Sequence, residues 1–460
     1  MKRVLSVLLM LVLVLAMGVC ASSCASTGSG DKNDGQYADY TPGGSADVSA
    51  EVMEALTNSG TVSSYVFTEE DTAGRPAHLG GLNNKNFQTL FKEVYGGELD
   101  LRIIEWEGWE SKFISDFAAD DAPDMIYGFA KLWPKIANRG MVYSNKELAE
   151  MGVVGLDHPI LKDGFEAVDA NFTYKGDVYG LALHRSGCFW SIVNEDLYKQ
   201  YGVKSPSEYY AEGIWDMDAL AKSGNELITA AGLNDAGERE IFGYYCWDST
   251  AFIRANGQQL IGFDGATGTL TNNCKKLEVV EAMENLRAAF QDGYATTDSS
   301  GFAKGRIGII AVTDENVTSN VKDLTFNWSI IPFPKGSANT NNQLPGSVSA
   351  WMVTSSTDNA QGVVNLVIAY LAAVEDGTLP LGDNCVESYF KDKPDTLQMI
   401  LDSKIHGVND NMYGVGTLWG AQWEFWKQIR SGKKGVAETI ESYSSMFDAQ
   451  VEQEMAQATN

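Results

Sequence analysis

Strand-like and helix-like segments alternate along most of this chain. Residues 99–106 (LDLRIIEW) begin with the alternation of a strand, and residues 307–312 (IGIIAV) form an apolar run of the length typical of a buried strand. Two segments have helical stripes instead. The stripe in residues 276–292 consists of Leu277, Val280, Met283, Leu286 and Phe290, and the stripe near the C-terminus of Val436, Ile440, Tyr443, Phe447, Val451 and Met455. Strands separated by helices predict layered α/β architecture, rather than a sandwich or a solenoid.

The start of the chain has the pattern of a lipoprotein signal peptide. Lys2 and Arg3 precede an apolar run over residues 4–19, and the small residues 21–23 (ASS) precede Cys24. The run is shorter than the ~20 residues that a membrane-spanning helix needs. We expect residues 1–23 to be the signal peptide and Cys24 the lipidated residue, with Cys20 as the alternative. Residues 24–60 are expected to be a flexible tether, because the segment is rich in Gly, Ser and Asp.

Length and charge exclude some classes of protein. The 437 residues after the signal exceed the ~100 to 200 residues of a usual domain, which indicates at least two lobes. Removal of Lys2 and Arg3 from the 34 basic residues leaves 61 acidic residues against 32 basic ones. Nucleic-acid binding is disfavoured, because neutralising phosphates needs a basic face.

Motifs of common enzymes and metal sites are missing. The sequence has no nucleophile elbow, no zinc-protease helix, no complete calcium loop and no phosphate-binding loop. Its four histidines are far apart, so we expect no metal site and no cofactor. Cys188, Cys246, Cys274 and Cys385 are too sparse to imply a disulfide scaffold, and the sequence leaves open whether Cys246 and Cys274 are bonded. A glycosidase would need only two carboxylates at a suitable separation, so an enzyme stays possible.

Eleven tryptophans are the chemical feature that the chain has in excess. Several stand beside polar residues, as in residues 246–249 (CWDS) and 416–420 (GTLWG). A flat apolar ring with a polar N–H suits the face of a sugar ring. Core packing is the competing interpretation, and it is favoured for Trp215 and Trp426, which lie on predicted helices with apolar neighbours.

Six segments, taken in order, resemble those of a known family. They are residues 86–91 (NFQTLF), 117–127 (FAADDAPDMIY), 174–181 (YKGDVYGL), 191–198 (SIVNEDLY), 302–309 (FAKGRIGI) and 330–334 (IIPFP). In this order and spacing the chain resembles the extracellular solute-binding proteins of ABC importers, in particular the family that binds sugars and oligosaccharides. The resemblance covers roughly residues 80–455.

The resemblance implies an α/β, two-lobe periplasmic-binding-protein-like fold of type II, with hinge strands and a ligand cleft between the lobes. The first lobe would comprise residues 61–187 plus 331–352, and the second residues 188–330 plus 353–460. Matching segments place the three crossings near residues 186–194, 328–334 and 349–355.

Candidate ligand-binding residues follow from the same resemblance. Trp419 stands twelve residues before Ser431 and Trp247 ten residues before Gly257, which are the spacings of stacking aromatics in maltose-type members. Asp248 would accept hydroxyl protons beside Trp247. Where the family often has an aromatic loop, this chain has Asp314 and Glu315. The remaining candidates are Phe129, Trp133, Arg185 and Trp351.

The predicted function is therefore the capture of a sugar or oligosaccharide outside the cytoplasmic membrane. The resemblance implies ABC transporter permease subunits and, through them, a separate ATPase as partners, with attachment to the outer face of the membrane by the lipid anchor. It implies no catalysis. A cell-surface carbohydrate-active hydrolase, or a binding protein for a cationic ligand such as a polyamine, remain the alternatives.

Overall fold

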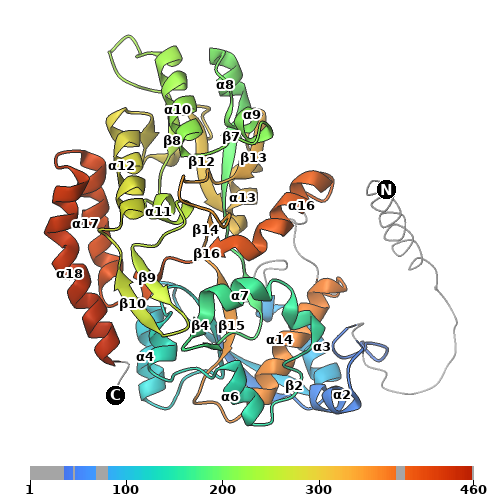
Figure 1. The fold of residues 1–460 in the computed structure, drawn as a ribbon. Helices are drawn as coiled ribbons and strands as arrows, with labels where there is room; N and C mark the ends of the chain where they lie inside the picture. Colours follow the sequence, from blue (N-terminus) through green and yellow to red (C-terminus); the bar gives the residue numbers. More distant parts are fainter. Residues whose placement is uncertain (1–35, 45–46, 69–80, 380–388, 458–460) are drawn as a thin grey trace, which may run out of the picture. The chain divides into compact units, whose positions relative to one another are not determined.

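Two five-stranded sheets organise the chain (Figure 1). The computed structural model describes residues 36–44, 47–68, 81–379 and 389–457. The first sheet has the order β2 (Gly97–Ile103), β1 (Gly60–Val66), β3 (Met125–Gly128), β15 (Ser349–Val353) and β6 (Leu183–Arg185). The second sheet has the order β11 (Ala295–Thr296), β8 (Phe242–Tyr245), β12 (Ile307–Thr313), β7 (Phe189–Asn194) and β13 (Trp328–Pro332).

In the first sheet, β1 is parallel to both β2 and β3, and β15 runs antiparallel to β3 and β6. Parallel strands need helical crossovers, and helices indeed separate β1, β2 and β3 in the chain. The elements before β6 are α2 (Ala50–Leu56), η2 (Gly81–Asn83), α3 (Lys85–Tyr95), α4 (Trp109–Ala118), α5 (Lys135–Asn138), α6 (Asn145–Glu150), η3 (Pro159–Lys162), α7 (Phe165–Phe172) and the hairpin of β4 (Thr173–Tyr174) and β5 (Asp177–Val178).

The second sheet is buried on both faces. Along β12, Ile309 and Ala311 pack into one apolar cluster, whereas Ile310 and Val312 pack into a second cluster on the opposite face. Successive strand side chains point to opposite faces, so a strand covered on both sides must be apolar at nearly every position. This explains the continuous apolar run predicted as a buried strand at residues 307–312, which is confirmed.

Helices supply the cover of the second sheet. They are α8 (Glu195–Tyr201), α9 (Pro206–Ala211), α10 (Met217–Ala231), α11 (Ala251–Ala255), α12 (Leu277–Gln291), η4 (Ser299–Gly301), α13 (Asp314–Val321), α16 (Pro394–Ser403), η5 (Lys404–His406), η6 (Asn411–Gly414), α17 (Leu418–Ser431) and α18 (Val436–Gln457), with the hairpin of β9 (Ile261–Asp264) and β10 (Thr269–Asn272). Both helices predicted from apolar stripes are confirmed. Leu277 is an exception within its stripe, because it is the first residue of α12 and is 77% exposed.

Three features depart from the predicted division of the chain. Helix α14 (Ala360–Glu375) was expected in the second lobe, but it packs against α3 and β1 of the first sheet (Figure 1). Strands β13 and β15 lie within the second and first sheets, so residues 328–334 and 349–355 are not two separate crossings. The predicted tether 24–60 contains α2, whose Leu56 is buried, so its last part is ordered.

A short ribbon lies where the chain passes between the two sheets. Strand β14 (Leu344–Pro345) follows β13 and pairs in parallel with β16 (Gly407–Val408), which follows α16. Asn171 of α7 donates a hydrogen bond to the Gly407 carbonyl at 2.9 Å, and the side chain of Asn409 bonds both backbone groups of Val348. The ribbon is thus held by side-chain amides: Asn171 reaches it from α7, and Asn409, which follows β16, joins it to Val348 just before β15.

Close packing of α10 on the second sheet gives a stability prediction. A Cβ added at Gly224 would lie 2.6 Å from Cδ2 of Tyr294, whereas one added at Gly420, in α17, would meet nothing within 4 Å. We expect Gly224→Ala to lower the free energy of unfolding by about 1 to 3 kcal/mol through overpacking. Gly420→Ala should raise it by about 0.5 to 1 kcal/mol, because alanine is the better helix former. Urea unfolding of both variants checks this, and equal effects would contradict it.

Candidate functional site

Aromatic side chains gather where the parallel strands of the first sheet end. Phe67 follows β1, Trp106 follows β2 and Phe129 follows β3. The ring of Trp106 lies 5.0 Å from Phe67 and 5.7 Å from Phe129, edge to face in both cases. Trp106 is 42% exposed, and the buried Trp109 packs against the same two phenylalanines. Ligands of open α/β sheets bind outside the carboxyl ends of strands, so Trp106 stands where a ligand would be met.

Helix α17 brings two further exposed rings to this place. Trp419 and Trp423 lie one turn apart with ring centroids separated by 5.5 Å, and Tyr413 packs edge-on to Trp419 at 4.7 Å. The Lys131 ammonium lies 5.2 Å from the ring centroid of Trp106 and 4.9 Å from that of Trp419, and it pairs with Glu110 at 3.1 Å. A single cation therefore joins the aromatic group of the first sheet to the tryptophans of α17.

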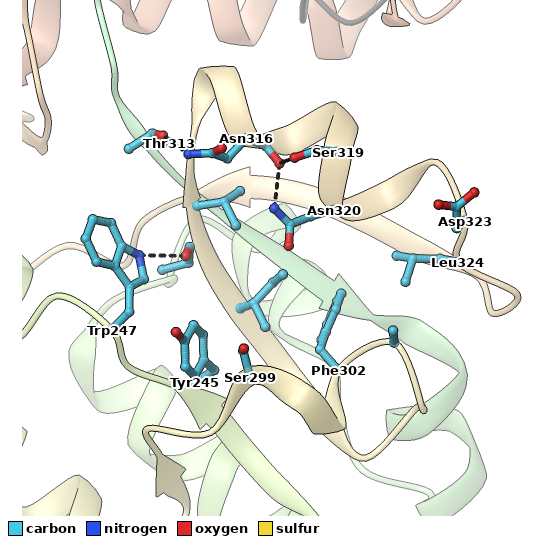
Figure 2. Close-up of a pocket in the computed structure, with 14 residues that line it drawn as sticks. Tyr245, Trp247, Ser299, Phe302, Thr313, Asn316, Ser319, Asn320, Asp323 and Leu324 are labelled. Atoms are coloured by element: carbon cyan, nitrogen blue, oxygen red, sulfur yellow. Dashed lines mark hydrogen bonds between the residues drawn. The ribbon is translucent and has the colours of Figure 1, made fainter. Parts of the chain in front are cut away.

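Trp247 occupies the equivalent position after β8 of the second sheet. Its indole Nε1 donates a hydrogen bond to the Ala311 carbonyl at 3.1 Å, and its ring lies 5.4 Å from Phe189. These contacts fix the ring orientation, yet 41% of the residue stays exposed. Trp247 also lines a cavity of about 400 Å³ in front of β12 (Figure 2).

Asp248, next to Trp247, belongs to a buried network. Its Oδ2 accepts from Arg254 Nη2 at 2.5 Å, and its Oδ1 accepts from the Thr250 backbone N–H and hydroxyl. Arg254 also donates to the carbonyls of Gly346 and Val408, which lie in the connecting ribbon. Burial raises the pKa of Asp410 close by, an effect that the Arg254 charge opposes. Both oxygens of Asp248 are engaged, so it does not present the acceptor that was predicted for a ligand hydroxyl.

Sequence and geometry together place the chain in a family. The family model described as bacterial extracellular solute-binding protein matches residues 81–376, which is more than half of the chain. The chain belongs to this family. No curated protein matches it.

Solved structures similar to this solute-binding protein share its fold. An ABC substrate-binding protein from Listeria monocytogenes, in complex with cycloalternan, is 16% identical with a TM-score of 0.60, over 85% of this chain and 99% of that one. The GacH receptor of Streptomyces glaucescens, solved unliganded and with acarbose, is 16% identical with a TM-score of 0.55, over 86% and 99%. UgpB from Mycobacterium tuberculosis, with glycerophosphocholine, is 15% identical with a TM-score of 0.62, over 86% and 100%. The fold is the two-lobe, type II periplasmic-binding-protein-like fold.

Phe129 and Arg185 lie together on the first-sheet side. The Arg185 guanidinium lies 5.3 Å from the Phe129 ring centroid and donates to the Ser347 hydroxyl at 2.9 Å. Phe129 is only 4% exposed, so it supports Trp106 rather than offering a face of its own. His184 packs against Tyr127, and burial holds the pKa of His184 well below its ordinary value.

Two predicted stacking residues are core residues in this solute-binding protein. Trp133 and Trp351 are both fully buried. The Trp133 ring packs against Phe172 and Phe263, and the Trp351 ring against Tyr127 and Tyr370. Neither ring has an exposed face that a ligand could contact. The prediction that Trp133 and Trp351 bind the ligand is therefore wrong. Trp215 and Trp426 are buried, as predicted for core residues.

Several residues with a predicted role lie outside the described part of the structure. Asp314 and Glu315 begin α13, but their side chains lie outside the described part, as do Cys24, Cys20 and Cys385. Cys246 and Cys274 form no disulfide, and burial raises the pKa of the Cys246 thiol to about 12. Within the described residues there is no cluster of metal-ligating side chains and no helix long and apolar enough to cross a membrane.

Three side chains of the site were not predicted from the sequence: the exposed Trp106 and Trp423, and the half-buried Lys131. Trp106 is the last residue of the segment 99–106 that was predicted to begin as a strand, so its place near a strand end was a usable signal. Trp423 lies four residues after Trp419, which is one helical turn. Lys131 carries no sequence signal, because the two rings that it contacts, Trp106 and Trp419, are more than 300 residues apart in the chain.

The buried pair gives a second stability prediction. Asp248→Ala leaves the Arg254 charge buried without its carboxylate, so we expect the free energy of unfolding to fall by about 3 to 5 kcal/mol. As a control, Lys92→Ala breaks the exposed Lys92–Glu98 pair and should leave the free energy of unfolding almost unchanged, because solvent screens an exposed ion pair. Unfolding in guanidinium chloride measures the free energy of unfolding of both variants. Similar decreases for the two variants would show that the buried Asp248–Arg254 network stabilises the fold no more than an exposed ion pair does.

Proposed function

We propose that this protein captures a sugar or oligosaccharide between its lobes and delivers it to the permease of an ABC importer. The observation that carries the proposal is the set of exposed, orientation-fixed tryptophans at ligand-binding positions of both lobes: Trp106, Trp247, Trp419 and Trp423. Large exposed aromatics that are grouped mark binding sites, whereas single ones are ordinary surface, and Lys131 groups Trp106 with Trp419 and its neighbour Trp423. Four of them in one protein of a solute-binding family point to a ligand with flat apolar faces.

Carbohydrate is the ligand class that these rings fit best. A sugar ring offers C–H faces for stacking and hydroxyls for nearby polar groups. If each stack contributes about 0.5 to 1.5 kcal/mol beyond burial, three stacks supply a sizeable part of the ~8 kcal/mol of a micromolar complex. Two of the proteins that share the fold were solved with cycloalternan and with acarbose, which supports the same class.

Binding is proposed to close the lobes about the segments that join them. A ligand can contact both lobes only when they are closed. Binding therefore shifts the population of molecules from the open to the closed form. Lys131, which contacts a ring on each side, would have to move when a sugar stacks on Trp419. The ligand then replaces the cation–π contact of Lys131 with a stacking contact on the Trp419 ring.

Attachment and delivery complete the proposal. Cys24 would carry the lipid that holds the protein on the outer face of the cytoplasmic membrane, with Cys20 as the alternative site. The permease, and through it a separate ATPase, would supply the membrane passage and the energy. No catalytic step is proposed for this chain itself.

A cationic ligand is the second candidate. The UgpB structure holds glycerophosphocholine, whose choline end is a cation of the kind that tryptophan faces bind. The net charge of −27 favours it as well, and the Lys131 ammonium over the rings of Trp106 and Trp419 shows that these rings accept a cation. A thermal-shift screen with oligosaccharides, spermine and choline esters separates the classes, since ligand at a hundredfold excess over Kd stabilises the fold by roughly 2.7 kcal/mol. Recovery of a shifting glycan as fragments would instead indicate a hydrolase.

Removal of one ring tests the stacking role. Trp419→Ala should bind its sugar about 2- to 12-fold more weakly, which corresponds to the loss of one stack. Tyr210→Ala removes an equally exposed ring from α9, distant in the chain from every site residue, and should bind as wild type does. Isothermal titration calorimetry with the sugar found in the screen measures both. Unchanged affinity in Trp419→Ala would overturn its assignment as a stacking platform.

Lipid attachment is tested in the cell. Cys24→Ser should prevent incorporation of labelled palmitate and release the protein from the membrane fraction, because one thiol carries the anchor. Cys20→Ser is the matched control and should change neither. If only the Cys20→Ser variant lost the palmitate label, Cys20 rather than Cys24 would be the lipidated residue.

A further inference from the structure

The two lobes touch each other at a second place besides the ribbon of β14 and β16. On the second-lobe side lie the β9–β10 hairpin and the last turns of α18, and on the first-lobe side lie α5 and the β4–β5 hairpin (Figure 1). The Gly176 backbone N–H donates to the Gly265 carbonyl at 3.1 Å and joins the turns of the two hairpins. The side chains of this interlobe contact are Trp133, Asn138, Arg139 and Tyr174 of the first lobe, and Phe263, Glu454 and Gln457 of the second.

The apolar half of the interlobe contact is one ring of the second lobe packed on two rings of the first. Phe263, in β9, stacks on Tyr174 with ring planes at 4° and ring centroids 6.2 Å apart, and it meets Trp133 edge to face at 6.2 Å. Trp133 is fully buried, and Tyr174 is 5% exposed. Moving the lobes apart at this place would expose part of each ring, at a cost of about 25 cal/mol for each Å² of apolar surface.

The polar half of the interlobe contact joins α5 to the end of α18. Asn138 Nδ2 donates to the Glu454 carbonyl at 3.1 Å, and Asn138 Oδ1 accepts from the Tyr174 hydroxyl at 2.5 Å. Arg139 Nη2 donates to the side-chain oxygen of Gln457 and lies 3.6 Å from Glu454 Oε1. The Glu454 side chain is only 3% exposed. A buried carboxylate needs a cation nearby, and here the cation comes from the other lobe.

Both sides of the interlobe contact are continuous with the surfaces that face the ligand. In the first lobe, Lys131 contacts the Trp419 ring and shortly precedes α5 in the chain. In the second lobe, Trp419 lies in the first turn of α17, and this turn is tied to α18 because the Thr417 backbone N–H donates to Gln450 Oε1 at 2.8 Å. A motion that draws Lys131 away from Trp419 therefore also draws α5 away from α18.

We propose that the interlobe contact is a latch that holds the two lobes closed before any ligand arrives. The apparent Kd of a ligand that binds the closed form is its intrinsic Kd divided by the fraction of molecules that are closed. A latch that raises this fraction tightens binding without touching the ligand. Arg139 and Phe263 are therefore positioning residues. The inference concerns the lobes alone, so it holds for whichever ligand the protein takes.

A pivot is the competing interpretation of the same contact. A pivot keeps its contacts while the lobes move, whereas a latch loses them when the lobes open. The contact shares its supporting elements with the ligand-facing Lys131 and Trp419, which must separate when the lobes open. This arrangement favours a latch, and the two interpretations predict different effects when the contact is weakened.

Distances between two spin labels test the latch without ligand. One label on α6 (Lys146→Cys) and one on α10 (Thr229→Cys) report how far apart the lobes are, because both positions are exposed and lie in different lobes. The measurement uses the full chain in detergent micelles, and the chain without introduced cysteines gives the background labelling. Arg139→Ala should raise the ratio of open to closed molecules roughly tenfold, which is the effect of losing one hydrogen bond to a charged group.

Arg287→Ala is the matched control for Arg139→Ala. Arg287 forms an ion pair of the same 3.6 Å length with Glu284, but both residues lie on α12 within the second lobe. This variant should keep the label distances of the wild type. Phe263→Ala removes the apolar half of the contact, so it should shift the distances in the same direction as Arg139→Ala. Thermal unfolding followed by circular dichroism checks that each variant is folded.

Three results would overturn the latch. Unchanged label distances in both Arg139→Ala and Phe263→Ala would mean that the contact is a pivot, kept in the open form. An equal shift in Arg287→Ala would mean that any lost ion pair loosens the chain. Shorter label distances in Arg139→Ala would mean that the contact opposes closure. The proposed function is tested separately by the thermal-shift screen, so it can stand or fall independently of these results.

Discussion

The buried guanidinium of Arg254 is the constraint on which the arrangement of the site depends. It is 1% exposed, and it bonds Asp248 together with the backbone carbonyls of Gly346 and Val408. Removing an arginine from water costs several kcal/mol, and this cost is offset when all of its partners are in place. The ribbon between the sheets and the loop after β8 must therefore take up their positions together.

This network links the ligand platform to the connection between the lobes. Trp247 precedes Asp248 directly, so the backbone that carries the exposed ring is fixed by the same ion pair that holds β14 and β16. On the other side, Asn171 and Asn409 fix the ribbon to the first-sheet elements. A ligand that shifts Trp247 thus acts on residues in contact with the segments about which the lobes are proposed to move. Contiguous contacts of this kind are one way in which energetic coupling between a site and a hinge is carried.

The fold could be predicted further from the sequence than the site. The strand at residues 307–312 and the helices α12 and α18 could be predicted because the buried side chains of each element recur at the spacing of a strand or a helix. This pattern of apolar residues is contained within one short segment of sequence. Helix α14 was assigned to the wrong lobe, because an apolar helix carries no information on which of two sheets it covers. Asp248 was interpreted as a ligand group, because its partner Arg254 and the two carbonyls meet it only in the folded chain.

The tryptophans show the same limit most clearly. Trp351 and Trp106 both lie on or beside strands of the first sheet, yet one is fully buried and the other 42% exposed. The difference comes from their places in the sheet: Trp351 is inside β15, whose two neighbours are β3 and β6, whereas Trp106 follows the carboxyl end of β2. Position relative to a strand end therefore accounts for the different exposure of these two rings, which residue type alone does not. Trp247, which follows β8, is exposed in the same way, so the ends of β2 and β8 each carry an exposed ring at the edge where open α/β sheets generally bind ligands.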